Sequence, residues 1–395
     1  MPVVKKHILP LIVLAQFCCT SLWFASNAVI SDLALNFDLK ATAVGNLTSA
    51  VQFGFILGTL LYALLAIADR FSPSKVFFLS ALVGATFNLA LLWKGNSLTT
   101  LLIMRFLTGF FLAGIYPVGM KIAADYFEQG LGKSLGFLVG ALVLGTAFPH
   151  FLKGIAGSLA WEFVIICTTG LAISGGLLLL LLVPNGPFRK QSQGVTLKAF
   201  TAIFKNKKLR TAAFGYFGHM WELYAFWAFL PLMLLTFMKT HAIPDVTIPI
   251  LSFIIIGSGS LACVLSGYLS EKFGAKKIAI IALSLSCLCC LASPLFFVQN
   301  SAPLFISFLV FWGMVVVADS PLLSTLVAQN ASPEVKGTAL TIVNSIGFAI
   351  TIISIQLISW LQLSTNSSWI YSCLAIGPVI GLFALRKKTP VSHTS

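Results

Sequence analysis

The chain has 395 residues, of which 58% are hydrophobic and only 9% are charged. Soluble domains carry about 25% charged residues, so this composition excludes an ordinary soluble enzyme or binding domain. The net charge of +14 would suit a nucleic-acid partner, but the basic residues cluster in short loops on one side of the apolar runs. This is the positive-inside pattern of membrane proteins. We therefore expect an all-α polytopic membrane protein embedded in a lipid bilayer, with no nucleic-acid partner.

Twelve apolar runs follow one another along the chain. Each is roughly 20 residues long, which is enough to cross a hydrocarbon core of about 30 Å. The expected spans are 8–30, 43–66, 75–94, 98–124, 132–156, 161–183, 210–237, 247–269, 277–298, 302–328, 336–361 and 367–385. Basic residues flank both ends of this series, so both termini are expected in the cytoplasm. We expect a monomer in the inner membrane of a bacterium.

The sequence repeats itself at an interval of about half its length, a period typical of transporters with two related halves. Asp69-Arg70-Phe71 recurs as Glu271-Lys272-Phe273, and Tyr116-Pro117 recurs as Ser320-Pro321. We expect two pseudo-symmetric six-helix bundles. The expected division is a first bundle at 1–184, a basic cytoplasmic linker at 185–209, a second bundle at 210–388 and a cytoplasmic tail at 389–395. The linker is expected to be either an amphipathic surface helix or a solvated basic segment.

Two stretches carry a family resemblance. GYLSEKFGAKK at 267–277 is similar to the loop signature of the major facilitator superfamily, which has a Gly, an acid four residues later, a base, a Gly and two bases. RFLTGFFLAG at 105–114 resembles the fourth-helix motif of the same superfamily, which begins with Arg. Together with the twelve spans and the repeat, the resemblance covers the whole chain. No subfamily is assigned.

The resemblance implies a fold and a mode of action. Two six-helix bundles would enclose a central cavity lined by the first, fourth, seventh and tenth spans, and rocking of the bundles would give alternating access. Asp69 and Arg70 in the first loop copy, and Glu271, Lys272 and Gly274 in the second, are candidate gating-loop residues. Their acids would latch the halves by binding helix ends or bases. The alternative is that these charges only fix the topology.

Arg105 lies several residues inside the fourth span. A guanidinium at that depth is costly, so it should face a cavity or a partner. It would either bind an anionic group of the substrate bidentately or organise the helices by holding an acid deprotonated. A third possibility is that it extends its charged end to the membrane surface.

The seventh span contains His219 and Glu222, three residues apart on one helix face, followed by Tyr224 and Trp227. A carboxylate near mid-membrane is either paired or neutral, and both states suit proton coupling. Glu222 is therefore the first candidate for a coupling residue, and His219 would tune it. A structural pair between helices is the alternative. A His and a Glu without further ligands do not predict a metal site, and we expect no cofactor.

Four further candidates belong to the other cavity-lining spans. Asp319, beside Ser320-Pro321 in the tenth span, is a second residue for protonation or a partner for Arg105. Trp23 and Asn27 in the first span, and Tyr116 in the fourth, would face the cavity.

The sequence therefore predicts a secondary active transporter, moving a small polar or anionic organic solute by alternating access with protons as coupling ions. Efflux of amphipathic or siderophore-like compounds is one alternative. A non-transporting membrane receptor or assembly protein is another, from a different class. No nucleophile–base constellation and no Gly-rich phosphate loop is recognisable, so we do not expect an enzyme or an ATP-driven pump.

Overall fold

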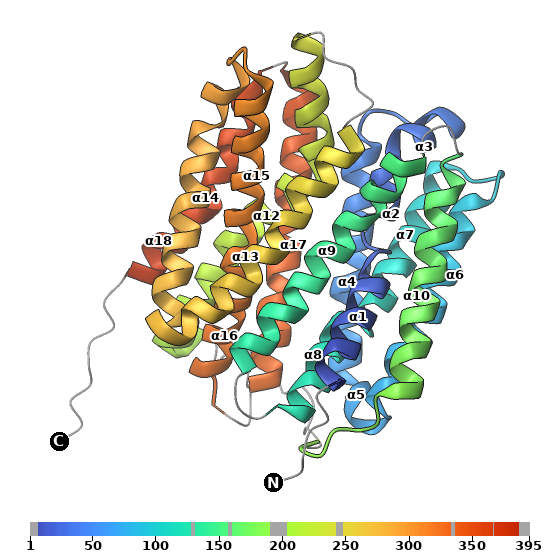
Figure 1. Ribbon diagram of the computed structural model, residues 1–395, viewed down its shortest axis with the longest axis vertical. Coiled ribbons are helices and arrows are strands. Elements are labelled where there is room, and N and C mark those ends of the chain that lie inside the picture. Colours follow the sequence, from blue (N-terminus) through green and yellow to red (C-terminus); the bar gives the residue numbers. More distant parts are fainter. Residues whose placement is uncertain are drawn as a thin grey trace.

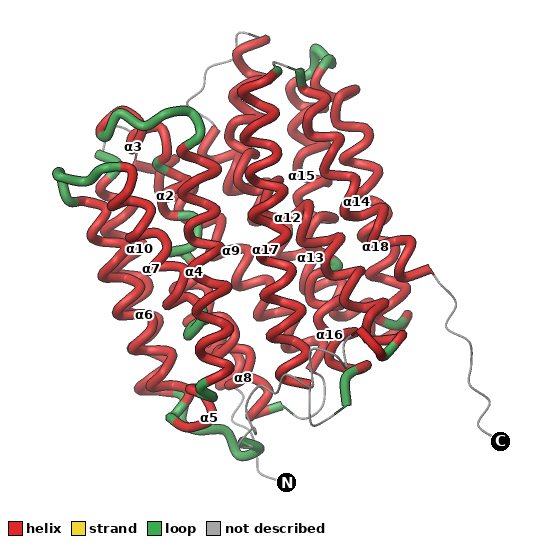
Figure 2. Tube along the Cα trace, turned by 180° about the vertical axis from the view of Figure 1, so that it is seen from behind, coloured by secondary structure: helices red, strands yellow, loops and turns green. Residues whose placement is uncertain are grey.

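The computed structural model describes residues 7–127, 131–156, 160–189, 204–241, 248–332, 336–365 and 367–386. Every regular element within these ranges is helical (Figure 2). In the same ranges, eleven helical spans are long and apolar enough to cross a membrane, and a shorter apolar helix, α1 (Ile8–Thr20), opens the first span. The predicted all-α polytopic membrane fold is thus confirmed.

The helices form two groups that lie side by side, the first blue to green and the second yellow to red (Figure 1). The first group comprises α1, α2 (Ala25–Ala28), α3 (Ile30–Asn36), α4 (Ala43–Leu64), α5 (Ile67–Arg70), α6 (Pro73–Leu89), η1 (Ala90–Leu92), α7 (Leu98–Leu112), α8 (Tyr116–Tyr126), α9 (Leu131–Ala156) and α10 (Glu162–Leu182). The second comprises α12 (Lys207–Thr240), α13 (Ile248–Phe273), α14 (Ala275–Phe297), α15 (Ala302–Ala318), α16 (Ser320–Asn330), α17 (Lys336–Ser364), η3 (Ser368–Ala375) and α18 (Ile376–Arg386).

The repeat is visible in the helix breaks. The fourth span divides into α7 and α8, and the tenth divides into α15 and α16. Helices α8 and α16 have 11 residues each, and they start at Tyr116 and Ser320, with a proline in the first turn of both. Proline lacks the N–H that continues a helix, and its ring clashes with the preceding turn. A helix discontinuity is therefore present beside the proline in both halves.

The first span differs from the prediction. It was expected as one helix over 8–30, but α1 ends at Thr20, a turn follows, and α2 and α3 continue the span to Asn36. The sequence contains no proline or glycine at this break. Its physical cause is a side chain of α7 that binds two carbonyl groups of the turn, as the site geometry shows below.

The linker and tail boundaries shift or fall outside the described ranges. Helix α12 begins at Lys207, inside the segment expected to be the linker. Residues 190–203 and 387–395 are not described, so the proposed amphipathic helix and the cytoplasmic tail lie outside the structure. At the other end of the linker, the chain at 183–189 packs against the start of α6, where Ser74 Oγ donates to Val183 O at 2.7 Å.

Two helix pairs join the halves. Helix α9 packs along α13, and α4 packs along α17 (Figures 1 and 2). Near one end of the second pair, Gln356 Nε2 donates to Ser49 Oγ at 2.9 Å. These two seams surround the central region in which the candidate site lies.

Within the first half, α4 and α7 touch backbone to backbone. A Cβ added at Gly54 would lie 1.9 Å from Phe106 O, and one added at Gly109 would lie 2.0 Å from Val51 O. Small residues at such contacts let membrane helices approach closely. The position of α7, which carries Arg105, depends on this contact.

We predict that Gly109→Ala destabilises the protein by about 1–3 kcal/mol, because the added methyl group forces the two backbones apart. A thermal unfolding scan of purified protein should show a melting temperature several degrees below that of the wild type. Gly170→Ala is the matched control, since nothing lies within 4 Å of the added Cβ in the middle of α10. Equal melting temperatures for the two variants would contradict the close contact.

Candidate substrate and proton site

Arg105 is fully buried in the first half, and its guanidinium binds the backbone of the broken first span. Nη2 donates to Leu22 O at 3.0 Å and to Trp23 O at 2.5 Å. These carbonyls lie in the turn between α1 and α2, where the helix ladder is interrupted. The guanidinium supplies the donors that the interrupted helix lacks, so it stabilises the break.

Asn88 connects Arg105 to a further span. Arg105 Nη1 donates to Asn88 Oδ1 at 3.3 Å, and Asn88 Nδ2 donates to Thr168 Oγ1 and Thr169 Oγ1, both at 3.1 Å. The network therefore holds the first, third, fourth and sixth spans together within one half. Of the roles expected from the sequence, the geometry here corresponds to organising helices, and the hydrogen bonds of Arg105 go to neutral groups.

Glu222 lies at the opposite side of the central region, in the second half. Its carboxylate accepts hydrogen bonds from Trp312 Nε1 at 2.6 Å and from Ser286 Oγ at 2.7 Å. The side chain is only 1% exposed. Among the described residues, no base forms an ion pair with it. Trp312 and Ser286 could not be recognised from the sequence as partners of Glu222, because they come from α15 and α14 and follow no spacing relative to Glu222.

His219 and Asp319 form a second buried group. Nδ1 of His219 lies 2.8 Å from Oδ1 of Asp319, and both side chains are 1% exposed. The contact is close, but neither atom has a partner in a well-formed hydrogen bond among the described residues. Asp319 occupies the junction between α15 and α16. Its partner in this structure is thus His219, and the pairing with Arg105 that the sequence allowed is not formed.

The remaining polar candidates of the first span bind neighbouring helices. Asn27 Nδ2 donates to Thr48 Oγ1 at 2.8 Å, and Trp23 Nε1 donates to Gln52 Oε1 at 3.2 Å. Both acceptors are on α4. These bonds fix the segment after the break against the second span.

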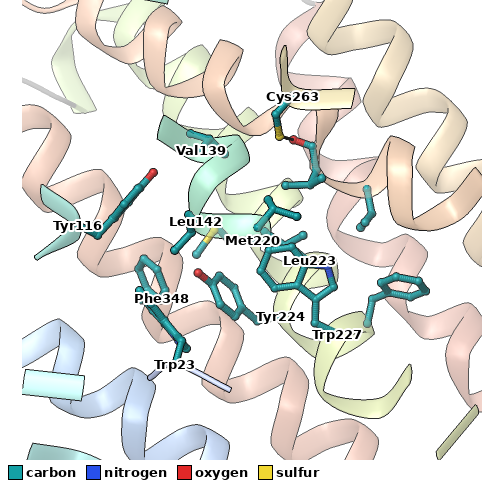
Figure 3. Packing of buried hydrophobic residues seen from close by; sticks show 14 of the residues in the cluster. Trp23, Tyr116, Val139, Leu142, Met220, Leu223, Tyr224, Trp227, Cys263 and Phe348 are labelled. Carbon is teal, nitrogen blue, oxygen red and sulfur yellow. Dashed lines mark hydrogen bonds between the residues drawn. The ribbon is translucent and has the colours of Figure 1, made fainter. Parts of the chain in front are cut away.

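An aromatic cluster spans both halves at this level (Figure 3). It consists of the rings of Trp23, Phe24 and Phe55 from the first half and of Tyr224, Trp227 and Phe348 from the second. The Trp23 ring lies 5.6 Å from that of Phe348 and 5.7 Å from that of Tyr224, measured between centroids. Such pairs contribute about 0.5–1.5 kcal/mol each beyond their area burial. The cluster is thus a cohesive contact between the two halves.

A small central cavity lies next to this cluster, with room for about one water molecule. Its wall is formed by Tyr116, Val139, Leu142, Tyr216, Met220, Leu223, Tyr224, Trp227, Val317, Ser320 and Phe348. Five of these eleven residues are aromatic, and none is charged. The sequence predicted that four aromatic residues face the cavity. Tyr116, Tyr224 and Trp227 do line it, whereas Trp23 is not part of its wall and packs on Phe348.

The two candidate gating loops differ from one another. Asp69 forms an ion pair with Lys121 of α8 at 2.7 Å, and Lys121 also lies 3.7 Å from Asp125. Arg189 donates to the backbone carbonyl of Asp69 at 2.8 Å. All these groups belong to the first half or to the chain just after it, so this cluster does not latch the halves to each other here.

The second loop copy makes fewer contacts. Glu271 and Lys272 are exposed, as is Arg70 in the first copy. No described residue forms an ion pair with Glu271. Gly274 has a φ of 84°, a left-handed conformation that other residues adopt only with strain, and it ends α13 just before α14 begins. The signature glycine therefore has a structural reason in the turn.

The sequence profile of the Major Facilitator Superfamily matches residues 12–355. The chain belongs to this superfamily. Membership agrees with the two groups of helices, the internal repeat and the helix breaks, and it identifies the chain as an integral membrane protein of a family of transporters.

Relatives and similar structures support the same fold. An uncharacterized transporter of Escherichia coli O157:H7, YgaY, is 25% identical over 234 residues, covering 55% of this chain and 58% of its own. An uncharacterized MFS-type transporter of Schizosaccharomyces pombe, C18.02, is 30% identical over 130 residues, covering 33% of this chain and only 25% of its own. The chain thus aligns with a minor part of one relative and just over half of the other.

Among solved structures, the human organic anion transporter MFSD10 has a TM-score of 0.73 at 14% identity, covering 96% of this chain and 99% of its own. The proton:xylose symporter XylE also has a TM-score of 0.73, at 15% identity, covering 95% of this chain and 94% of its own. At these identities the similarity shows the shared fold.

We predict that Arg105→Lys destabilises the protein by about 1–3 kcal/mol, since one ammonium group cannot bind both carbonyls and Asn88, and unsatisfied buried carbonyls are costly. Thermal unfolding of purified protein measures this. Arg210→Lys is the control, because Arg210 is exposed and donates to a single carbonyl, Phe204 O. If both variants have the same melting temperature as the wild type, Arg105 does not stabilise the break in the first span.

Proposed function

We propose that this chain is a proton-coupled secondary transporter of a small organic solute, working by alternating access between its two halves. The observation that carries the proposal is the surroundings of Glu222, a buried carboxylate in the seventh span without a basic partner among the described residues. The proposal includes a monomer in a bacterial inner membrane with both termini in the cytoplasm, as expected from the loop charges.

The surroundings of Glu222 favour proton binding. An ionised carboxylate within a membrane is expensive unless a counter-ion accompanies it. Trp312 and Ser286 donate hydrogen bonds but bring no charge. A proton on Glu222 removes the cost in this closed arrangement, and release of that proton requires water to reach the group. Movement of α12 against α14 and α15 would open such a route, which links protonation to conformation.

His219 and Asp319 provide a second titratable group beside the cavity. His219 is on α12 together with Glu222, and Asp319 precedes the cavity-lining Ser320. Breaking this pair frees the junction between α15 and α16. Both titratable groups therefore adjoin helices that must move if the cavity is to open, whereas Arg105 in the other half is bound to backbone.

A second candidate function, efflux of amphipathic compounds, has one observation in its favour. The cavity wall is aromatic and aliphatic and carries no charge. This wall suits an uncharged or amphipathic solute better than an anion. The second candidate differs from the first in the kind of solute and in fixing the direction of transport as export.

The test of proton coupling is transport in proteoliposomes. A thermal-shift screen of purified protein against a metabolite library supplies the solute. We expect accumulation of that solute only when a pH gradient is imposed. Glu222→Gln, which imitates the protonated acid, should bind the solute and exchange it across the membrane but fail to accumulate it.

Asp38→Asn is the control for the loss of a carboxylate, because Asp38 is exposed in the loop after α3. It should accumulate the solute as the wild type does. Accumulation that ignores the gradient, or a Glu222→Gln variant that accumulates normally, would show that Glu222 does not couple transport to protons.

A further inference from the structure

Most charged groups near the cavity contact other groups of the protein, although Oδ2 of Asp319 and Nε2 of His219 have no hydrogen-bond partner among the described residues. Arg105 binds two backbone carbonyls and Asn88. Asp319 contacts His219, and Glu222 accepts from Trp312 and Ser286. None of these ionic side chains lines the cavity. An ionic substrate would therefore enter a site whose wall carries no counter-charge, which is unfavourable in a desolvated setting.

The cavity wall does offer uncharged hydrogen-bonding groups. The indole Nε1 of Trp227 is buried and has no hydrogen-bond partner among the described residues, although Trp227 lines the cavity. A buried donor without an acceptor is unfavourable, so such a group indicates a ligand or a water molecule. The hydroxyl of Tyr216 donates to Asn344 Oδ1. Those of Tyr116 and Tyr224 donate to no described residue.

The faces of the aromatic rings are the second feature of the site that can contact a ligand. The aromatic cluster contains pairs that join the halves, such as Trp23 with Phe348 (Figure 3) and Phe24 with Trp227. If the halves separate at this level, the pairs part and their faces become available. A planar ring in the solute would replace the lost ring contacts, so binding would offset part of the cost of opening.

We propose that the substrate is an uncharged organic molecule with a planar aromatic ring and a hydrogen-bond acceptor at its edge. The ring stacks among Tyr224, Phe348 and Trp23 as the cluster opens. The acceptor receives the Trp227 indole N–H, and Tyr116 contributes a hydroxyl. This inference rests on the proposed transport function and narrows its substrate class.

A matched series of three indoles tests the charge and the ring together. Tryptophol is uncharged, tryptamine is a cation and indole-3-acetate is an anion, and all three share one ring. Calorimetric titration of the purified wild-type protein, corrected for titration into empty micelles, should show that tryptophol binds at least about tenfold more tightly than either charged analogue. Tighter or equal binding of a charged analogue, or no binding of any of the three at millimolar concentration, would overturn the proposal.

Two variants test the named contacts. Trp227→Phe keeps the ring and removes the donor, and it should weaken tryptophol binding about fivefold. Phe348→Leu removes a ring face and should weaken it by a similar factor. Phe383→Leu is the control, because Phe383 is 71% exposed on the outside of α18, and it should bind as the wild type does. Unchanged affinity in both site variants would place the ligand elsewhere.

The outcome is separable from that of the transport test, because binding is measured in detergent without a gradient. If tryptophol binds as described but is not moved by a pH gradient in proteoliposomes, the coupling proposal fails and the substrate class stands. If another solute is transported with protons and the indoles do not bind, the substrate class fails alone.

Discussion

The hydrogen bonds from Arg105 to the carbonyls of Leu22 and Trp23 are the interaction on which the centre of the structure depends. They allow the first span to stop being a helix inside the membrane, where unsatisfied backbone groups are otherwise excluded. The unwound turn directs the Trp23 ring toward Phe348 and Tyr224 of the other half. One buried cation thus converts a helix break into a contact between the halves, and Gly54 and Gly109 hold the helix that carries it in place.

The two halves share a fold but differ in their chemistry. The first half holds a permanent charge whose hydrogen bonds go to backbone and amide groups. The second holds Glu222 and the His219–Asp319 pair, whose charge changes with a proton. Tyr224 and Trp227 lie on the same helix as Glu222, so a shift of α12 that follows proton release would also disturb the aromatic cluster. Under the proposed proton coupling, this arrangement would link protonation in the second half to the aromatic contact between the halves.

Much of the fold could be predicted from the sequence because its signals are local. Apolar length gave the spans, and Tyr116-Pro117 and Ser320-Pro321 indicated the two breaks that the structure shows. The break after Thr20 had no such signal, since its cause is a side chain about 80 residues away. The sequence could not predict the partners of Glu222 or the pairing of His219 with Asp319 for a similar reason. Each contact joins two different helices, and residue spacing does not fix how those helices are rotated about their axes. The aromatic cluster could not be distinguished from the many other phenylalanines in a chain of this composition.

The proposed mechanism requires the halves to separate and close around the aromatic cluster in response to protonation. Single-molecule energy transfer between fluorophores at Lys94 and Asn300 measures this movement. Both positions are exposed in loops of different halves, and non-canonical amino acids allow labelling there without modifying the native cysteines, which are buried or partly buried. We expect two populations whose proportions change with pH in the wild type and no longer change in Glu222→Gln. A single population at every pH, or an equal pH response in both proteins, would contradict it.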